Sequence, residues 1–305
     1  MTAMPFGICP LPRSLKPLLA IALLCLTLAC AAARAEELLW GIVPLPGAFN
    51  VRDGQVTDGM LFETMQLLEA QLPELSMRYE VLSMARVEQR MRELGQMCGS
   101  GQLQSSERDR LGYFVPHVLA TPIHVLVRRQ TLEQLLVEDG QVSLDWLFAN
   151  PYLRGALAKA RVYPADIQPR LQQAVREGRL QALGGSLAGE NLLLMVSHRR
   201  LDYVFDYPLI YTEVVRHFSL SEPLISVPLR ESSQLVPLGI YCPRNPWGAG
   251  MATRIDQAVR QISAQPEQLL AIYQRWLPAE VFAHYRPQLL AFLRQRASAT
   301  APIFD

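Results

Sequence analysis

The sequence predicts an α/β protein built from two lobes, and three observations carry this prediction. Strand patterns and helix patterns alternate from residue 38 to residue 98, which is typical of a largely parallel sheet. The same alternation repeats between residues 131 and 217, which predicts a second lobe. An extended run over residues 222–227 then precedes another strand, so the chain is expected to return to the first lobe.

The first 35 residues have the features of a secretion signal. Two basic residues precede an apolar run over residues 18–29, and Ala33-Arg34-Ala35 matches the small-residue pattern of a cleavage site. Cleavage there would leave 270 residues, 305 less 35, which suffice for two lobes. The alternatives are an uncleaved anchor and lipid attachment at Cys30. No later stretch has the ~18 apolar residues of a spanning helix, so a periplasmic protein without membrane insertion is expected.

The charge balance argues against nucleic acid as a partner. The chain has 29 basic and 28 acidic residues, and removal of Arg13, Lys16 and Arg34 with the leader would leave 26 basic residues. The mature chain would carry a net charge near −2, the difference between 26 and 28. Neither nucleic acid nor an anionic membrane surface is therefore an expected partner.

Two of the five cysteines, Cys98 and Cys242, lie outside the leader. In an exported protein a disulfide is the simplest explanation of such a pair, and it would tie distant segments into one lobe. The alternative is two separate buried thiols. No metal is expected, because two cysteines without paired histidines do not complete a tetrahedral site. No cofactor is expected either.

The first lobe is predicted to begin with a buried strand over residues 38–43, which Pro44-Leu45-Pro46-Gly47 ends. Open α/β sheets bind their ligands at the carboxyl ends of such strands. Asp58 is positioned to cap the next helix. Residues 78–82 alternate as a second strand, and a short helix then leads to a third strand that begins at Met97.

Residues 98–129 contain the main candidate for a ligand contact. Arg108 is expected to bind an anionic group, with a structural ion pair as the alternative. Gly99-Ser100-Gly101 precedes it, and the backbone amides and the Ser100 hydroxyl of this turn form an anion nest or only a flexible turn. Arg86 begins a helix and offers a second cationic contact, or lies in solvent at the helix end. An alternating run over residues 123–127 predicts a crossing between the lobes.

The second lobe is predicted to contain a short strand over residues 161–163, helices on either side of it, and a strand over residues 201–206. Three helical stripes after residue 251 are interpreted as packing surfaces. Phe49, Tyr163 and Tyr207 are candidates for the wall of a ligand cleft, because their rings are flat and two have polar tips. Ordinary burial of these aromatic side chains is the alternative.

One pattern imitates a hydrolase. Gly184-Gly185-Ser186 resembles a nucleophile elbow, but a loop that enters a helix explains it equally well. The histidines show no metal-binding spacing. Hydrolase activity at Ser186 is therefore not expected.

Five patterns occur in a fixed order over nearly the whole mature chain. They are Gly59-Met60-Leu61-Phe62-Glu63, Glu107-Arg108 with Phe114 six residues later, the crossing near Val125, Arg200-Leu201-Asp202-Tyr203, and Ile255-Asp256 with Tyr273 and Trp276 downstream. Together they resemble the extracellular solute-binding proteins of family 3. These are periplasmic type II binding proteins, and they include the amino-acid-binding components of transporters.

The resemblance implies an α/β, two-lobed periplasmic binding protein-like II fold with mixed sheets, flanking helices and two hinge crossings. After the leader, 1–35, lobe 1 would be residues 36–126 plus 224–305, and lobe 2 residues 127–223. A solute would be enclosed between the lobes, with its carboxylate on Arg108. The implied partner is an ABC transporter permease or a membrane sensor. The protein is expected to be a monomer and not an enzyme.

The departures from the family pattern concern the solute. Amino-acid binders carry a carboxylate for the ligand ammonium where this chain has Tyr207, and Asp206 lies one position earlier. A shift of one residue in a strand turns a side chain to the opposite face. The expected solute is therefore anionic or zwitterionic, with amine recognition by Asp206 left open. A branch of family 3 that carries cysteines placed like Cys98 and Cys242 is more similar still, which supports the disulfide.

Two other functions are weighed against solute capture. The first is a lyase or hydrolase on the same scaffold, which would need two ionisable groups that converge on Arg108. The second is a ligand-independent interaction domain, which would need lobes that are held together by the protein's own side chains.

Overall fold

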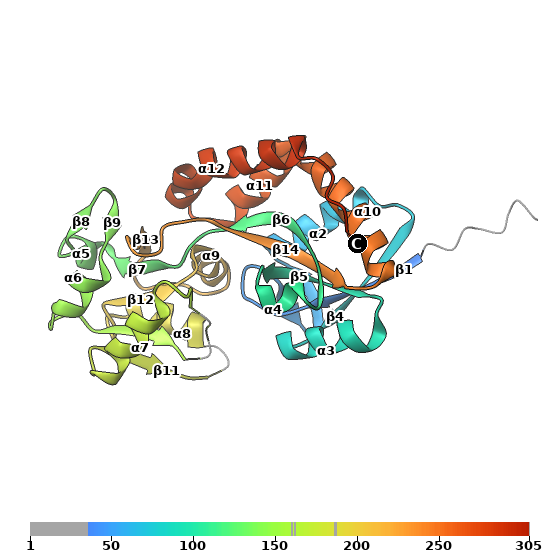
Figure 1. The fold of residues 1–305 in the computed structure, drawn as a ribbon. Helices are drawn as coiled ribbons and strands as arrows, with labels where there is room; N and C mark the ends of the chain where they lie inside the picture. Colours follow the sequence, from blue (N-terminus) through green and yellow to red (C-terminus); the bar gives the residue numbers. More distant parts are fainter. Residues whose placement is uncertain (1–35, 160, 162, 186–187, 305) are drawn as a thin grey trace, which may run out of the picture. The chain divides into compact units, whose positions relative to one another are not determined.

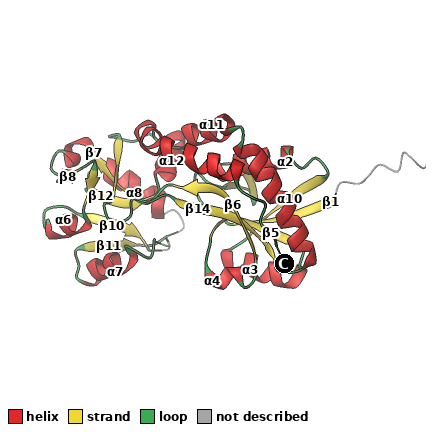
Figure 2. Cartoon of the chain, turned by 45° about the horizontal axis from the view of Figure 1, so that its top comes forward, coloured by secondary structure: helices red, strands yellow, loops and turns green. Residues whose placement is uncertain are grey.

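The computed structural model describes residues 36–159, 161, 163–185 and 188–304 (Figure 1). Two five-stranded sheets form its framework, and helices flank both of them (Figure 2). The expected signal peptide and Ser186 lie outside the described residues. In the part of the chain that is described, no helix has the length and apolar character needed to cross a membrane.

The first sheet is built mainly from the amino-terminal third of the chain. Its strands are β1 (Glu36–Ile42), β4 (Leu75–Val81), β5 (Met97–Leu103), β6 (Gly112–Ala120) and β14 (Val236–Pro243). They follow the order β4-β1-β5-β14-β6. β1 and β5 are parallel, whereas β14 is antiparallel to both β5 and β6. The predicted strands near residues 38–43 and 78–82 and after residue 97 are confirmed as β1, β4 and β5.

The second sheet lies between β6 and β14 in the sequence. Its strands are β7 (His124–Arg128), β10 (Gly155–Ala158), β11 (Leu180–Leu183), β12 (Tyr203–Asp206) and β13 (Leu224–Pro228). They follow the order β11-β10-β12-β7-β13. β10 is parallel to β11 and β12, and β7 is antiparallel to β12 and β13.

The two predicted crossings are strands of this second sheet. β7 contains most of the first alternating run and β13 most of the second, so residues 121–123 and 229–235 join the two sheets. The proposed lobe boundary between residues 126 and 127 falls inside β7. The boundary between residues 223 and 224 falls at the first residue of β13. The division into lobes stays a prediction.

The strand predicted over residues 161–163 is wrong. β10 ends at Ala158, and Arg161 and Tyr163 lie in the loop that follows it. The Tyr163 hydroxyl accepts a hydrogen bond from the Ala158 backbone N–H at 3.0 Å, so the loop folds back on the strand end. Pro164, which has no N–H to donate to a ladder, follows directly.

The helices that cover the first sheet come from the amino-terminal and the carboxyl-terminal parts of the chain. They are α2 (Met60–Ala70), α3 (Met84–Leu94), α4 (Ser106–Asp109), α10 (Pro246–Ser263), α11 (Pro266–Trp276) and α12 (Ala279–Ser298). α10 packs on β6 and β14, and α12 packs on α10 and α11 (Figure 1). The three carboxyl-terminal stripes are thus confirmed as packed helices.

The sequence pattern predicted that Asp58 caps α2, and this prediction is wrong. The cap residue is Gly59, with φ 127°, and the Asp58 carboxylate instead accepts a hydrogen bond from the Asn50 side chain. These two side chains join the hairpin of β2 (Asn50–Arg52) and β3 (Gln55–Asp58). A Cβ at position 59 would lie 2.2 Å from the Ala48 carbonyl oxygen, so only glycine fits this approach.

The remaining helices belong to the segment between the crossings. They are α5 (Arg129–Leu132), α6 (Leu144–Ala149), α7 (Gln168–Arg176), α8 (Ala188–Ser197) and α9 (Pro208–His217), and a hairpin of β8 (Val137–Glu138) and β9 (Gln141–Val142) accompanies them. The alternation of side chains along β7 and β12 separates two cores. Val125 and Phe205 belong to one core, and Leu126 and Val204 belong to the other, which continues into the first sheet.

A disulfide joins Cys98 on β5 to Cys242 on β14. The two strands are neighbours in the first sheet, and both cysteines are fully buried. The bridge spans 144 residues of sequence. The prediction of a disulfide that ties distant segments together is confirmed.

Candidate functional site

The carboxyl ends of β1 and β5 lie at one edge of the first sheet, because the two strands are parallel. β1 leads into the loop over residues 43–49, and β5 leads through Ser105 into α4, which carries Arg108. The Ser105 hydroxyl accepts a hydrogen bond from the Arg108 backbone N–H at 3.3 Å and so caps this short helix. Arg108 therefore follows the strand end at which open α/β sheets bind ligands.

The Arg108 guanidinium is bound to groups of the protein itself. Its Nε donates to a Glu88 carboxylate oxygen on α3 at 3.1 Å, and its Nη1 donates to the Leu103 carbonyl at 3.1 Å. The two side chains of the ion pair are 25% and 26% exposed. Water reaches both charges, so a solute carboxylate would compete with Glu88 in a partly solvated setting. The ligand role of Arg108 stays a prediction.

Phe49 and Ser100 are buried, and the partly buried Gly101 lies against the Phe49 ring. Phe49 is 2% exposed and Ser100 is 4% exposed. A Cβ on Gly101, where φ is +70°, would lie 2.8 Å from Leu61 and 3.3 Å from the Phe49 ring. The Ser100 hydroxyl is buried without a hydrogen-bond partner among the described residues. Their predicted ligand contacts remain untested.

Arg86 lies in the first turn of α3 and is exposed. Its Nη1 donates to the Gln89 side-chain carbonyl at 3.1 Å. Its backbone N–H donates to the Ser83 hydroxyl, which caps the helix. A second cationic contact from Arg86 stays a prediction.

At the second sheet, the carboxyl ends of β10 and β12 bring Arg161 and Asp206 together. Arg161 Nη2 donates to Asp206 Oδ2 at 3.0 Å, and the side chains are 15% and 2% exposed. Asp206 Oδ1 accepts from the Tyr207 backbone N–H at 2.9 Å. Burial raises the pKa of Asp206, and the Arg161 charge opposes this rise. The Asp206 carboxylate, which was considered as a partner for a ligand amine, is thus already paired with Arg161.

Tyr163 and Tyr207 lie beside this pair. Tyr163 is buried with its hydroxyl on the backbone of Ala158, and Tyr207 is half-buried at the start of α9. Gly189 leaves room for the ion pair, because a Cβ there would lie 2.4 Å from Arg161 Nη2 and 2.9 Å from Asp206 Oδ2. The contact of Tyr163 and Tyr207 with a solute stays a prediction.

Sequence reasoning missed Arg161 and Glu190 as members of this cluster. Burial, followed by the charge of Glu213, raises the pKa of Glu190, and Arg161 opposes that rise. The available signal was a basic residue shortly after the small apolar segment Gly155–Ala158, where a strand ends. Among the described residues, no three His, Cys, Asp or Glu side chains group as metal ligands.

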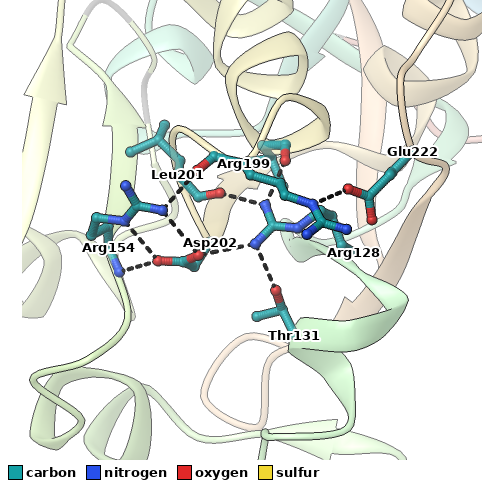
Figure 3. Close-up of polar contacts among 8 residues, drawn as sticks. Arg128, Thr131, Arg154, Arg199, Leu201, Asp202 and Glu222 are labelled. Atoms are coloured by element: carbon teal, nitrogen blue, oxygen red, sulfur yellow. Dashed lines mark hydrogen bonds and ion pairs between the residues drawn. The ribbon is translucent and has the colours of Figure 1, made fainter.

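Asp202 anchors the loop before β12, as Figure 3 shows. Arg128 Nη2 lies 3.0 Å from Asp202 Oδ1, and Arg154 Nε lies 3.0 Å from Asp202 Oδ2. Arg128 also donates to the carbonyls of Val196 and Leu201. Burial raises the pKa of Asp202, but the hydrogen bonds from Arg154 and Arg128 lower it to a net value below its usual range. These contacts fix Asp202 at the start of β12 as a structural anchor.

α9 connects the second sheet to the first-sheet helices. The Arg216 guanidinium lies 3.8 Å from the Trp276 ring centroid, and its Nη2 donates to the Arg275 carbonyl at 2.8 Å. A Cβ at Gly47 would lie 2.6 Å from the Leu209 carbonyl oxygen, so the loop after β1 also touches α9. These contacts hold α9 against α11 and against the loop after β1. In the sequence, a crossing separates α9 from each of these two segments.

Comparison with known proteins gives a fold and no sequence family. No protein-family model matches the chain, and no curated protein matches it. Among solved structures, a probable amino-acid ABC transporter extracellular-binding protein from Bacillus subtilis is similar, with 13% identity and a TM-score of 0.57. The match covers 80% of this chain and 99% of that chain.

Two further structures illustrate the range of similar proteins. An ancestral cationic amino acid solute binding protein has 14% identity and a TM-score of 0.59, over 81% of this chain and 97% of that chain. A histidine kinase sensor domain with similarity to periplasmic binding proteins has 15% identity and a TM-score of 0.55, over 80% of this chain and 97% of that chain.

These comparisons define the class of fold to which the chain conforms. It has the two-lobed periplasmic binding protein-like fold, with mixed α/β sheets and flanking helices. The fold predicted from the order of strands and helices, and from the resemblance to family 3, is therefore confirmed.

Proposed function

We propose that the protein is an extracytoplasmic solute-binding protein that captures a small anionic or zwitterionic solute. The observation that carries the proposal is the pair of open sheets joined by two crossings, each with charged side chains after the carboxyl ends of its parallel strands. The similar structures named above include two solute-binding proteins of the same fold. They favour binding over the alternative of a lyase or hydrolase on this scaffold.

Arg108 is the proposed contact for an acidic group of the solute. A guanidinium offers a planar pair of donors that matches a carboxylate. Its present partner, Glu88, is one quarter exposed, so the exchange of Glu88 for a solute carboxylate replaces one partly solvated ion pair with another. Ser100 adds a hydroxyl that has no partner among the described residues.

The second-sheet cluster supports an acidic solute more than an α-amino acid. The buried Asp206 is paired with the partly buried Arg161, and release of that partner would leave the Asp206 charge uncompensated. Recognition of a ligand ammonium by Asp206 would therefore be costly. Arg161, Tyr163 and Tyr207 are proposed as the second-sheet side of the solute site.

The proposed location is the periplasm, after removal of the leader. A disulfide is stable in such an oxidising compartment. The proposed partner is a transporter permease or a membrane sensor, since the similar structures include an ABC transporter binding protein and a histidine kinase sensor domain. The protein is proposed to act as a monomer.

A thermal-shift screen of the mature protein against pools of metabolites tests the proposal. A solute at a hundred times its dissociation constant stabilises the folded state by ~2.7 kcal/mol. We expect at least one acidic pool to raise the melting temperature of the wild type and of Arg110→Gln, but not of Arg108→Gln. Arg110 is the matched control, because it is exposed, lies two residues from Arg108 in the sequence and has the same charge.

Two outcomes would contradict the proposal. One is a screen in which no pool shifts the wild type. The other is a pool that stabilises Arg108→Gln as much as it stabilises the wild type, because the solute would then bind without the proposed guanidinium.

A further inference from the structure

A cavity of about 370 Å³ lies wholly within the second-sheet segment. Its lining residues all fall between Leu157 and Ala182, so it is formed by β10, the loop after it, α7 and β11. None of the first-sheet residues that the proposed solute site requires lines it. Its volume falls within the ~300–1,000 Å³ range of sites for small organic ligands.

The helix α7 supplies one wall of this cavity. Gln168, Gln172 and Arg176 recur every four residues, so they lie along one face of the helix. Leu171 and Val175, each next to that face, add apolar surface. The wall therefore combines hydrocarbon with amide donors and ends in a guanidinium.

The charge of the lining is of one sign. Lys159, Arg161 and Arg176 line the cavity, and among the described residues no aspartate or glutamate does. Within the described part of the chain, the Lys159 and Arg176 side chains form no hydrogen bond or ion pair, whereas Arg161 is held by Asp206. The Arg161 Nε is buried and has no hydrogen-bond partner among the described residues. A buried donor without an acceptor is costly, so it favours an acceptor in the cavity.

Lys159 is distinctive in the sequence as well. The chain contains two lysines, Lys16 in the leader and Lys159, and every other basic side chain among its 29 is arginine. The one lysine side chain outside the leader is therefore at this cavity.

We infer that this cavity is a second binding site, which takes a small organic carboxylate with an apolar body. The carboxylate lies between Lys159 and Arg176 and accepts hydrogen bonds from them. Leu171 and Val175 contact the hydrocarbon part. The site does not include Arg108. It shares Arg161 and Tyr163 with the second-sheet side of the proposed solute site, but its occupation does not require solute capture between the sheets.

Benzoate is a suitable probe, and neutral benzamide has the same body without the charge. We expect isothermal titration of the mature protein at low salt to show benzoate binding that weakens as salt is added. Benzamide should bind at least about tenfold more weakly, since charge-assisted hydrogen bonds contribute ~1.5–3 kcal/mol each.

Variants separate this site from surface charge in general. Lys159→Gln and Arg176→Gln should each weaken benzoate binding, and the double variant should abolish it. Both side chains are exposed, so the variants are expected to fold. Arg200→Gln is the matched control: Arg200 is exposed, lies in the same segment, and does not line the cavity. The affinity of the Arg200→Gln variant for benzoate should equal that of the wild type.

The single lysine of the mature chain allows a direct test of where benzoate binds. Reductive methylation of the mature protein with ¹³C-formaldehyde labels Lys159 and the chain terminus alone, and benzoate should shift the Lys159 methyl signal in an NMR spectrum. The terminal signal serves as the internal control. Arg108→Gln should leave this shift unchanged, even if that variant no longer binds the solute proposed above.

Four results would overturn the inference. They are no benzoate binding by the wild type, equal binding of benzoate and benzamide, unaltered binding by the Lys159→Gln, Arg176→Gln double variant, and loss of the Lys159 shift in Arg108→Gln. The last result would assign the benzoate to the first-sheet edge and would leave the proposed function intact.

Discussion

Arg128 shows how much of the second sheet depends on single charged side chains. It is 6% exposed, and it donates to Thr131, to two backbone carbonyls and to Asp202. Arg154 binds the other oxygen of the same carboxylate, but its side chain is 55% exposed. The two arginines therefore share a partner and differ in burial.

Replacement of Arg128 by methionine should lower the free energy of unfolding by about 3–5 kcal/mol, because it removes a buried donor from a partly buried carboxylate and from two carbonyls. The corresponding change at the exposed Arg154 should cost less than about 1 kcal/mol. Urea unfolding of both variants measures the difference. Equal losses would show that burial does not decide the strength of these ion pairs.

Two buried histidines make stability depend on pH. Burial, followed by the Arg296 charge, lowers the pKa of His117 to about 4, and burial, followed by the His284 charge, lowers the pKa of His124 to about 3. Both folded-state values lie below the unfolded value near 6.5. Their contribution to stability is therefore complete above pH ~6.5 and is lost as the pH falls through the folded-state values.

His117→Leu should reduce this loss. The His117 Nε2 has no hydrogen-bond partner among the described residues, so a leucine removes the titration without removing a bond of that atom. Between pH 6.5 and 4 the wild type should lose on the order of 3 kcal/mol through this group, in addition to the His124 effect. Urea unfolding at both pH values tests this expectation. A variant with the same loss as the wild type would contradict it.

Sequence patterns revealed some residues of the candidate site and missed others. Arg108 and Asp206 were found because their types and spacing resemble a known pattern. Arg161 was missed because its neighbours, Val162 and Tyr163, made the segment look like a strand. The Glu88 partner of Arg108 lies 20 residues away in sequence and on another helix, so no local pattern could predict that pair.

At the scale of elements, the disulfide between β5 and β14 is the strongest long-range constraint. Replacement of both Cys98 and Cys242 by alanine should lower the free energy of unfolding by about 2–5 kcal/mol, because the bridge restricts a long unfolded loop. Chemical denaturation with and without a reducing agent measures this loss. The reducing agent should destabilise the wild type and leave the double variant unchanged; an equal effect on both would mean that the bridge is not the cause.

Strands and helices with strong periodicity were predicted well, because their apolar faces match the cores they enter. β1, β5 and the carboxyl-terminal helices are examples. The cap of α2 was predicted wrongly, because the close approach of Gly59 to Ala48 is a tertiary contact. The crossings were predicted as extended segments, but their pairing in the second sheet depends on partners about 80 to 100 residues away.

At the scale of the whole molecule, the proposed solute capture predicts a change in the arrangement of the two sheets. The contacts of α9 with Trp276 and with the loop near Gly47 are those that such a change would alter. Small-angle scattering of the mature protein, with and without a solute found by the thermal-shift screen, should give different radii of gyration. Identical curves for a confirmed solute would contradict closure.

The bridge between Cys98 and Cys242 also makes a covalent ring of the chain between them. Every strand of the second sheet lies inside this ring, whereas β1 and α10 to α12 lie on its two tails. A protease that nicks one loop of the second sheet would open the ring without releasing a fragment. The nicked protein would remain one covalent molecule, heavier by one water, until a reductant separated the pieces, so a single band on a non-reducing gel would not report an intact second lobe.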